Sequence, residues 1–133
     1  MTLSNRMNHM PFSGNWISRF ASPSGNIHNF KLAVESDNST PAAHLTMRQI
    51  KSGDLKPSLF VNYVTQASVT GRFMGLLSTD SAGLGLNCMV LQLSENADSL
   101  SGLIAWNSLT AGCVQQGEIE FKRAPISASE NSD

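Results

Sequence analysis

Hydrophobic and polar residues alternate along most of the chain with the period of a β-strand. In residues 118–123, Ile119 and Phe121 face one way while Glu118 and Glu120 face the other. Residues 26–34 show the same alternation. A helix would need apolar residues at positions i, i+3, i+4 and i+7, and neither segment has them. The pattern therefore predicts an all-β protein.

Clusters of glycine, proline, asparagine and serine separate the alternating segments about every dozen residues, and these residue types favour turns. Eight strands are expected, at residues 14–20, 26–36, 43–51, 58–65, 68–77, 86–94, 100–109 and 114–123. The connections between them are too short for crossover helices, so consecutive strands should pair antiparallel.

Eight consecutive antiparallel strands within residues 14–123 favour a closed up-and-down β-barrel. A two-sheet sandwich with Greek-key connections is the alternative, because the number of strands does not separate the two architectures. The barrel domain is expected at residues 12–124. Residues 1–11 and 125–133 lack any period, and we expect them to form disordered tails.

The first and last expected strands carry a distinctive set of residues. The alternation places Arg123 on the inward face with Ile119 and Phe121, where an unpaired charge would be costly. If the barrel closes, Trp16 lies beside Arg123, and the guanidinium group can stack on the indole ring. We therefore expect Gly14, Trp16 and Arg123 to form a structural plug at one end of the barrel.

This Gly-x-Trp near the start of the chain, with an arginine on the closing strand, resembles the calycin superfamily of lipocalins, fatty-acid-binding proteins and avidins. The resemblance implies a calycin-like barrel, and the avidins in particular associate through their outer strands. The segments LSGLIAWNSL (residues 100–109) and GEIEF (residues 117–121) are also similar to the barrel effectors of bacterial cyclic-nucleotide antiphage defence. That second resemblance implies a nucleotide ligand.

Composition and charge narrow the range of partners. Charged residues make up 14% of the chain and the formal net charge is −1, which argues against a partner among nucleic acid polymers. No apolar run reaches the roughly 18–20 residues that span a bilayer, and no apolar signal segment precedes the first strand. The cysteines, Cys88 and Cys113, form no disulfide framework, so we expect a cytoplasmic protein with Cys88 in the core.

The interior of a small eight-stranded barrel is either filled by side chains or holds one small ligand. We expect a small, largely apolar molecule in the barrel mouth, with no cofactor, no metal and no catalytic residue. We expect Arg72 to lie in mid-strand between Gly71 and Phe73. The candidate ligand-binding residues are Phe30, Tyr63, Arg72, Phe73, Met74 and Trp106.

Two other functions are compatible with the sequence. A soluble sensor or sponge for a cyclic nucleotide would use Tyr63, Arg72, Arg48 and Arg19 to stack on bases and bind phosphates. A cyclase or isomerase acting on a hydrophobic biosynthetic intermediate would need few ionisable groups, because it works mainly by shaping its substrate.

The sixth expected strand is apolar on both faces. Met89 and Leu91 share one face, while Leu86, Cys88 and Val90 share the other. A strand covered on both sides indicates either a wide cavity or an interface on the barrel exterior. Because the seventh expected strand repeats the pattern, we predict a homo-oligomer, most simply a homodimer.

Overall fold

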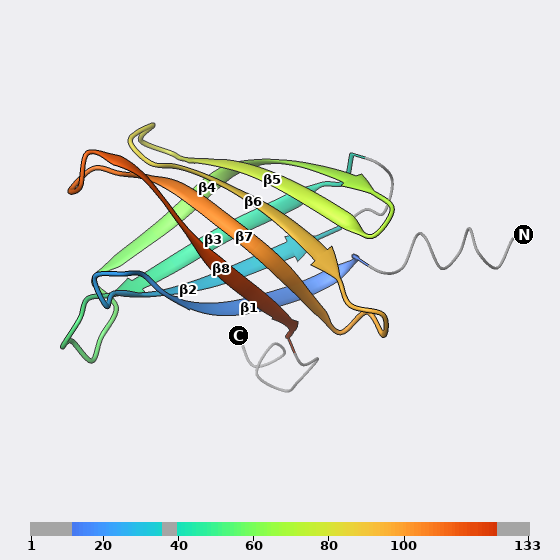
Figure 1. Ribbon diagram of the computed structural model, residues 1–133, viewed down its shortest axis with the longest axis horizontal. Coiled ribbons are helices and arrows are strands. Elements are labelled where there is room, and N and C mark those ends of the chain that lie inside the picture. The colour runs from blue at the N-terminus through green and yellow to red at the C-terminus, as the bar shows by residue number, and fades with distance from the viewer. Residues whose placement is uncertain (1–11, 36–39, 125–133) are drawn as a thin grey trace, which may run out of the picture.

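The computed structural model describes residues 12–35 and 40–124, which form one closed barrel of eight antiparallel strands (Figure 1). The strands are β1 (Gly14–Ala21), β2 (Ile27–Val34), β3 (Ala43–Ile50), β4 (Leu59–Thr70), β5 (Phe73–Asp80), β6 (Leu86–Leu93), β7 (Ser99–Ser108) and β8 (Cys113–Arg123). Each strand pairs with the next along the chain, and β8 returns to pair with β1. The predicted up-and-down barrel is confirmed and the sandwich alternative is wrong.

The predicted tails, residues 1–11 and 125–133, lie outside the described residues, so the domain boundaries stay a prediction. No helix in the described part of the chain is long and apolar enough to cross a membrane.

The turn between β4 and β5 lies elsewhere than the sequence suggested. A turn was expected at residues 66–67, but β4 continues to Thr70, which pairs with Phe73. The two residues between them, Gly71 and Arg72, make the hairpin turn, with Gly71 at φ +59° in the first turn position that a type II′ turn reserves for glycine. The mid-strand position expected for Arg72 is therefore wrong. Its guanidinium group donates from Nη2 to the carbonyl oxygen of Leu93 at 2.8 Å.

Buried and exposed side chains alternate along the strands, so one face of each strand fills the barrel. On β6, Met89 and Leu91 are buried while Cys88 and Val90 are exposed. The expectation that Cys88 belongs to the core is wrong, because both faces of this strand are apolar and composition could not tell which one points inward.

The end of the barrel where β1 begins and β8 ends is closed by side chains. The indole nitrogen of Trp16, whose side chain is fully buried, donates to the carbonyl oxygen of Phe12 at 3.0 Å. The guanidinium carbon of Arg123 lies 4.2 Å from the centre of the Trp16 ring, and Nη1 donates to the carbonyl oxygen of Ser13 at 2.7 Å. Gly14 has φ +123°, and a Cβ there would lie 2.9 Å from the same Nη1. Only glycine leaves room for this arrangement.

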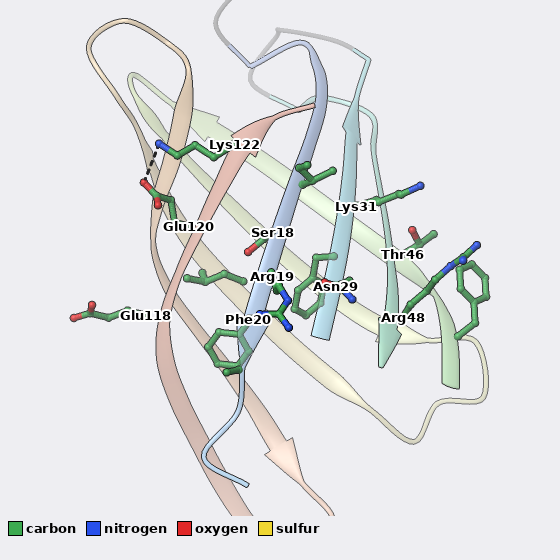
Figure 2. A pocket seen from close by; sticks show the side chains of 15 residues that line it. Ser18, Arg19, Phe20, Asn29, Lys31, Thr46, Arg48, Glu118, Glu120 and Lys122 are labelled. Atoms are coloured by element: carbon green, nitrogen blue, oxygen red, sulfur yellow. Dashed lines mark ion pairs between the residues drawn. The ribbon is translucent and has the colours of Figure 1, made fainter. Parts of the chain in front are cut away.

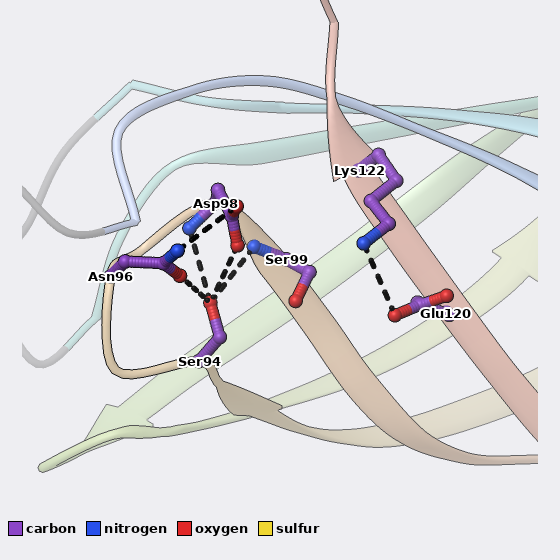
Figure 3. A network of polar contacts seen from close by, with 6 residues as sticks. All are labelled: Ser94, Asn96, Asp98, Ser99, Glu120 and Lys122. Atoms are coloured by element: carbon purple, nitrogen blue, oxygen red, sulfur yellow. Dashed lines mark hydrogen bonds and ion pairs between the residues drawn. The ribbon is translucent and has the colours of Figure 1, made fainter.

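The loop between β6 and β7 lies at this closed end and is held together by hydrogen bonds among its own residues (Figure 3). The hydroxyl of Ser94 accepts hydrogen bonds from the backbone nitrogens of Asp98 and Ser99, both at 3.1 Å. The resulting tight loop holds Ala97 at φ +61°, and the carbonyl oxygen of Ala97 accepts a 2.7 Å hydrogen bond from Nε of Arg123. The conformation of the loop is thus coupled to the closed end.

Two glycines that lie within strands differ in their surroundings. A Cβ at Gly102 of β7 would overlap the carbonyl oxygen of Val90, which shows that β6 and β7 approach closely there. A Cβ at Gly75 of β5 would have nothing within 4 Å. Close backbone approach is one reason for glycine inside a strand, and Gly102 is such a case.

Candidate functional site

A cavity of about 130 Å³ lies at the opposite end of the barrel, which we call the open end. Strands β1, β3, β5 and β7 end at this end of the barrel, and β2, β4, β6 and β8 begin here (Figure 1). The lining residues come from β1 to β7 and from the β5–β6 loop. We refer to this space as the mouth cavity. Its lining includes the aromatic or imidazole side chains of Phe20, His28, Phe30, Tyr63 and Trp106.

Four of these rings form a connected wall. The ring centres of Phe20 and Trp106 are 5.5 Å apart with their planes at 79°, an edge-to-face contact. Phe20 also lies 6.1 Å from His28, which in turn stacks at 6.4 Å on Phe30. A Cβ at Gly117 would lie 3.0 Å from Cζ of Phe20, so the glycine leaves room for that ring.

Polar groups on the rim of the mouth cavity hold the β5–β6 loop in place. The carboxylate of Asp80 accepts hydrogen bonds from the backbone nitrogens of Leu84 at 3.0 Å and Gly85 at 2.8 Å. The side-chain oxygen of Asn107 accepts from the nitrogen of Leu86 at 2.7 Å, and its amide nitrogen donates to the carbonyl oxygen of Leu84 at 3.2 Å. The loop at residues 81–85 is therefore tied to both β5 and β7.

Asn87 brings a polar group into the wall of the mouth cavity from β6. Its side chain is 5% exposed, and Oδ1 has no hydrogen-bond partner among the described residues. The only other such atom in the described part of the chain is Oγ of Ser18, which does not line this cavity.

Burial shifts the titration of two side chains in the mouth cavity. Desolvation raises the pKa of Tyr63 to about 12; the nearby carboxylate of Asp80 adds to the rise and a hydrogen bond with Asn87 opposes it. Desolvation also lowers the pKa of His28 below its usual value. At neutral pH the cavity therefore presents a protonated phenol and an uncharged imidazole.

The structure brings together three of the six predicted ligand-binding residues. Phe30, Tyr63 and Trp106 line the mouth cavity. Arg72, Phe73 and Met74 instead lie at or beside the β4–β5 turn, at the closed end of the barrel. Met74 is fully buried in the core, whereas Phe73 is 49% exposed on the outer surface. The prediction that these three share the mouth is wrong, because it placed the turn five residues too early.

Sequence reasoning did not select Phe20, Asn87 or Asp80, and it took His28 for a rim or core histidine. The alternation contained a signal for two of them, since Phe20 has the parity of Trp16 and Asn87 has that of Met89. What the alternation could not supply was the end of the barrel at which each residue lies.

A second hollow, of about 890 Å³, lies on the outer wall near the seam between β1 and β8 (Figure 2). The two strands pair in register only at Trp16 with Arg123 and Ile17 with Lys122. The hollow lies beyond these pairs, where side chains from both strands line it.

Three of the four cations that line this outer hollow come from β1, β2 and β3, and the fourth is Lys122 of β8. Figure 2 shows Arg19 on β1, Lys31 on β2 and Arg48 on β3, and the guanidinium carbon of Arg48 is 5.6 Å from the centre of the Phe60 ring. Glu120, which pairs with Lys122 at 3.5 Å, lies on the β8 side.

These features define the protein as a small closed β-barrel with one end sealed by side chains and an aromatic-lined cavity at the other. No family model and no curated protein matches the chain. Among solved structures, the chain is similar to a de novo designed fluorescence-activating β-barrel, with a TM-score of 0.60 and 18% sequence identity. The match covers 85% of this chain and 94% of the designed one, and at this identity it shows a shared fold.

Proposed function

We propose that this protein binds a small, largely apolar molecule in the mouth cavity. The observation that carries the proposal is the contrast between the two ends, one filled by the Trp16 plug and the other hollow and lined with rings. Small antiparallel barrels commonly hold one ligand at such a position, and the similar designed barrel is described as fluorescence-activating. A calycin-like relationship, based on Gly14, Trp16 and Arg123, belongs to the same proposal.

The size of the mouth cavity limits the ligand. An engineered cavity of about 150 Å³ lined by apolar side chains binds benzene. At about 130 Å³, the mouth cavity fits a single aromatic ring, and a fused two-ring molecule would reach into the opening. Larger ligands would have to project out of the barrel.

Titration with toluene is expected to raise the melting temperature and change the fluorescence of Trp106, because the ligand would contact that ring. Trp106→Ala should weaken binding about two- to tenfold in calorimetry, since an aromatic contact contributes about 0.5–1.5 kcal/mol. Native mass spectrometry of protein purified from its own host would give the mass of the natural ligand.

Phe73→Ala is the matched control, because Phe73 is a large ring on the outer surface at the other end of the barrel. It should leave the affinity for toluene unchanged. If Phe73→Ala weakens binding as much as Trp106→Ala, or if neither toluene nor benzene binds, the mouth cavity is not the binding site.

Binding of a cyclic nucleotide is the second candidate function, and it is better supported on the outer wall than in the mouth. No lysine or arginine lines the mouth cavity, whereas Arg19, Lys31 and Arg48 gather around the outer hollow. These three cations offer partners for phosphates, and the Phe60 ring beside Arg48 offers a surface on which a base could stack. A cyclic dinucleotide that raises the melting temperature, with the effect lost in Arg48→Gln, would favour this function.

A cyclase or isomerase would use the mouth cavity itself. Tyr63, His28 and Asp80 are the ionisable side chains in its lining, so they would be its candidate proton-transfer groups. Such an enzyme would convert a bound hydrophobic molecule into a product of the same mass with a different chromatographic retention time. That product would distinguish catalysis from binding alone.

We also propose that two copies associate through the outer face of β5, β6 and β7. The outward positions of these strands carry no charged residue: they are Phe73, Gly75, Leu77, Thr79, Leu86, Cys88, Val90, Gln92, Ser101, Leu103, Ala105 and Asn107. Val90 is 62% exposed and its register partner Leu103 is 53% exposed. A contiguous apolar face of this kind is typical of protein interfaces, and a two-fold dimer would bury it against itself.

Val90→Glu is expected to convert the dimer to a monomer, because it would bury two like charges at the centre of the interface. Sedimentation velocity would measure the change. Val64→Glu, on the outer face of β4 and similarly exposed at 65%, is the control and should leave the dimer intact. A wild-type protein that sediments as a monomer over the whole concentration range would refute the proposed association.

A cytoplasmic location is part of the same proposal. Cys88 and Cys113 are both exposed free thiols, and such cysteines stay reduced in the cytoplasm.

A further inference from the structure

The mouth cavity contains one polar atom whose hydrogen-bonding capacity is unused. Oδ1 of Asn87 has no partner among the described residues, although Asn87 is only 5% exposed. A buried acceptor without a partner is unfavourable, and native proteins keep few of them. Where such an atom lines a cavity, it indicates what the occupant of that cavity must supply.

The backbone nitrogens of the neighbouring loop do not serve this acceptor. The backbone nitrogens of Leu84, Gly85 and Leu86 already donate to the side chains of Asp80 and Asn107. The carboxylate oxygens of Asp80 are themselves the acceptors of two of these hydrogen bonds.

The phenol of Tyr63 is the other hydrogen-bonding group beside Asn87, and their interaction is the one that lowers the pKa of Tyr63. The amide nitrogen of Asn87 is the donor group of that side chain, so it can serve the phenol oxygen while Oδ1 stays without a partner.

We propose that the ligand of the mouth cavity is an aromatic molecule of about the size of indole that donates one N–H or O–H hydrogen bond to Oδ1 of Asn87. The inference rests on the proposed function and deepens it, since it assigns the polar contact that selects among apolar molecules. The rings of Phe20, Phe30 and Trp106 contact the apolar body of the ligand, and Asn87 recognises its single donor. A site built to hydrogen-bond one group discriminates against analogues that lack it.

The test compares indole with 1-methylindole, which has the same ring system without the N–H donor. The wild-type protein should bind indole about two- to tenfold more tightly in calorimetry, as expected for one neutral hydrogen bond. Asn87→Leu keeps a side chain of similar size without the acceptor, and it should bring the ratio of the two affinities close to one. Asn62→Leu, the same change on the outer face of β4, should keep the wild-type ratio.

Equal binding of indole and 1-methylindole by the wild type, as when a water satisfies Oδ1, would overturn the role of Asn87 and leave the proposed function standing. An unchanged preference for indole in Asn87→Leu would also overturn it. If neither indole, 1-methylindole nor toluene binds, both the inference and the proposed function fail. Circular dichroism and the melting temperature of Asn87→Leu establish that the variant is folded.

Discussion

Replacing Trp16 with alanine is expected to lower the free energy of unfolding by about 3–5 kcal/mol, the usual cost of removing a buried tryptophan. The substitution leaves a cavity in a fully buried position and removes the ring on which Arg123 stacks at 4.2 Å. Arg123 would keep its hydrogen bonds to the carbonyl oxygens of Ser13 and Ala97, but its charge would lose the covering indole. Urea denaturation followed by circular dichroism measures the loss.

Trp106→Ala is the natural control for this prediction, because it removes the same side chain at the open end, where it is only partly buried. It should cost less stability than Trp16→Ala and should weaken toluene binding more. If Trp16→Ala instead abolishes toluene binding and leaves the melting temperature unchanged, Trp16 is a ligand contact and not a plug.

Gly102→Ala is expected to destabilise the barrel by about 3 kcal/mol or more, at or above the upper end of the usual cost of overpacking. The added Cβ would overlap the carbonyl oxygen of Val90, which belongs to the backbone of the neighbouring strand. A side chain could rotate out of the way, but here the β6–β7 pairing itself would have to shift. The free energy of unfolding from urea denaturation tests the prediction.

Gly75→Ala, the same change inside strand β5, should act in the opposite direction. A Cβ at Gly75 meets nothing within 4 Å, so the alanine should stabilise the strand by about 0.5–1 kcal/mol. Equal destabilisation by the two substitutions would show that loss of a glycine inside a strand, and not the close approach at Gly102, is responsible.

The fold could be predicted from the sequence to the extent that it follows from alternation and connection length. The eight strands, their antiparallel order and the meeting of Trp16 with Arg123 all depend on patterns that span a whole strand. The β4–β5 turn depends on one local choice: residues 66–67 looked like a connection, yet Ala67 is buried and Gly71 makes the turn. A glycine followed by one other residue between two alternating segments is a hairpin signal, and Gly71-Arg72 carries that signal.

The candidate site was less predictable because it depends on which end of the barrel each residue reaches. A prediction that misplaces the β4–β5 turn by five residues also assigns Phe73 and Met74 to the mouth cavity, although they lie at the closed end. The importance of Asn87 could not be read from the sequence at all. It follows from a missing hydrogen bond, and that becomes visible only when the surrounding donors have been placed.

The hydrogen bond between Arg123 and Ser13 joins residues 110 positions apart, and it bears on how the chain folds. Strands β2 to β7 can each pair with a neighbour that has already been synthesised, but β1 has to wait for β8 before its second edge is covered. Contacts of such long range slow folding, and an uncovered strand edge is prone to pair with other chains. The nascent barrel therefore stays open along one seam until translation has passed Arg123, and that interval is when the protein is most exposed to aggregation.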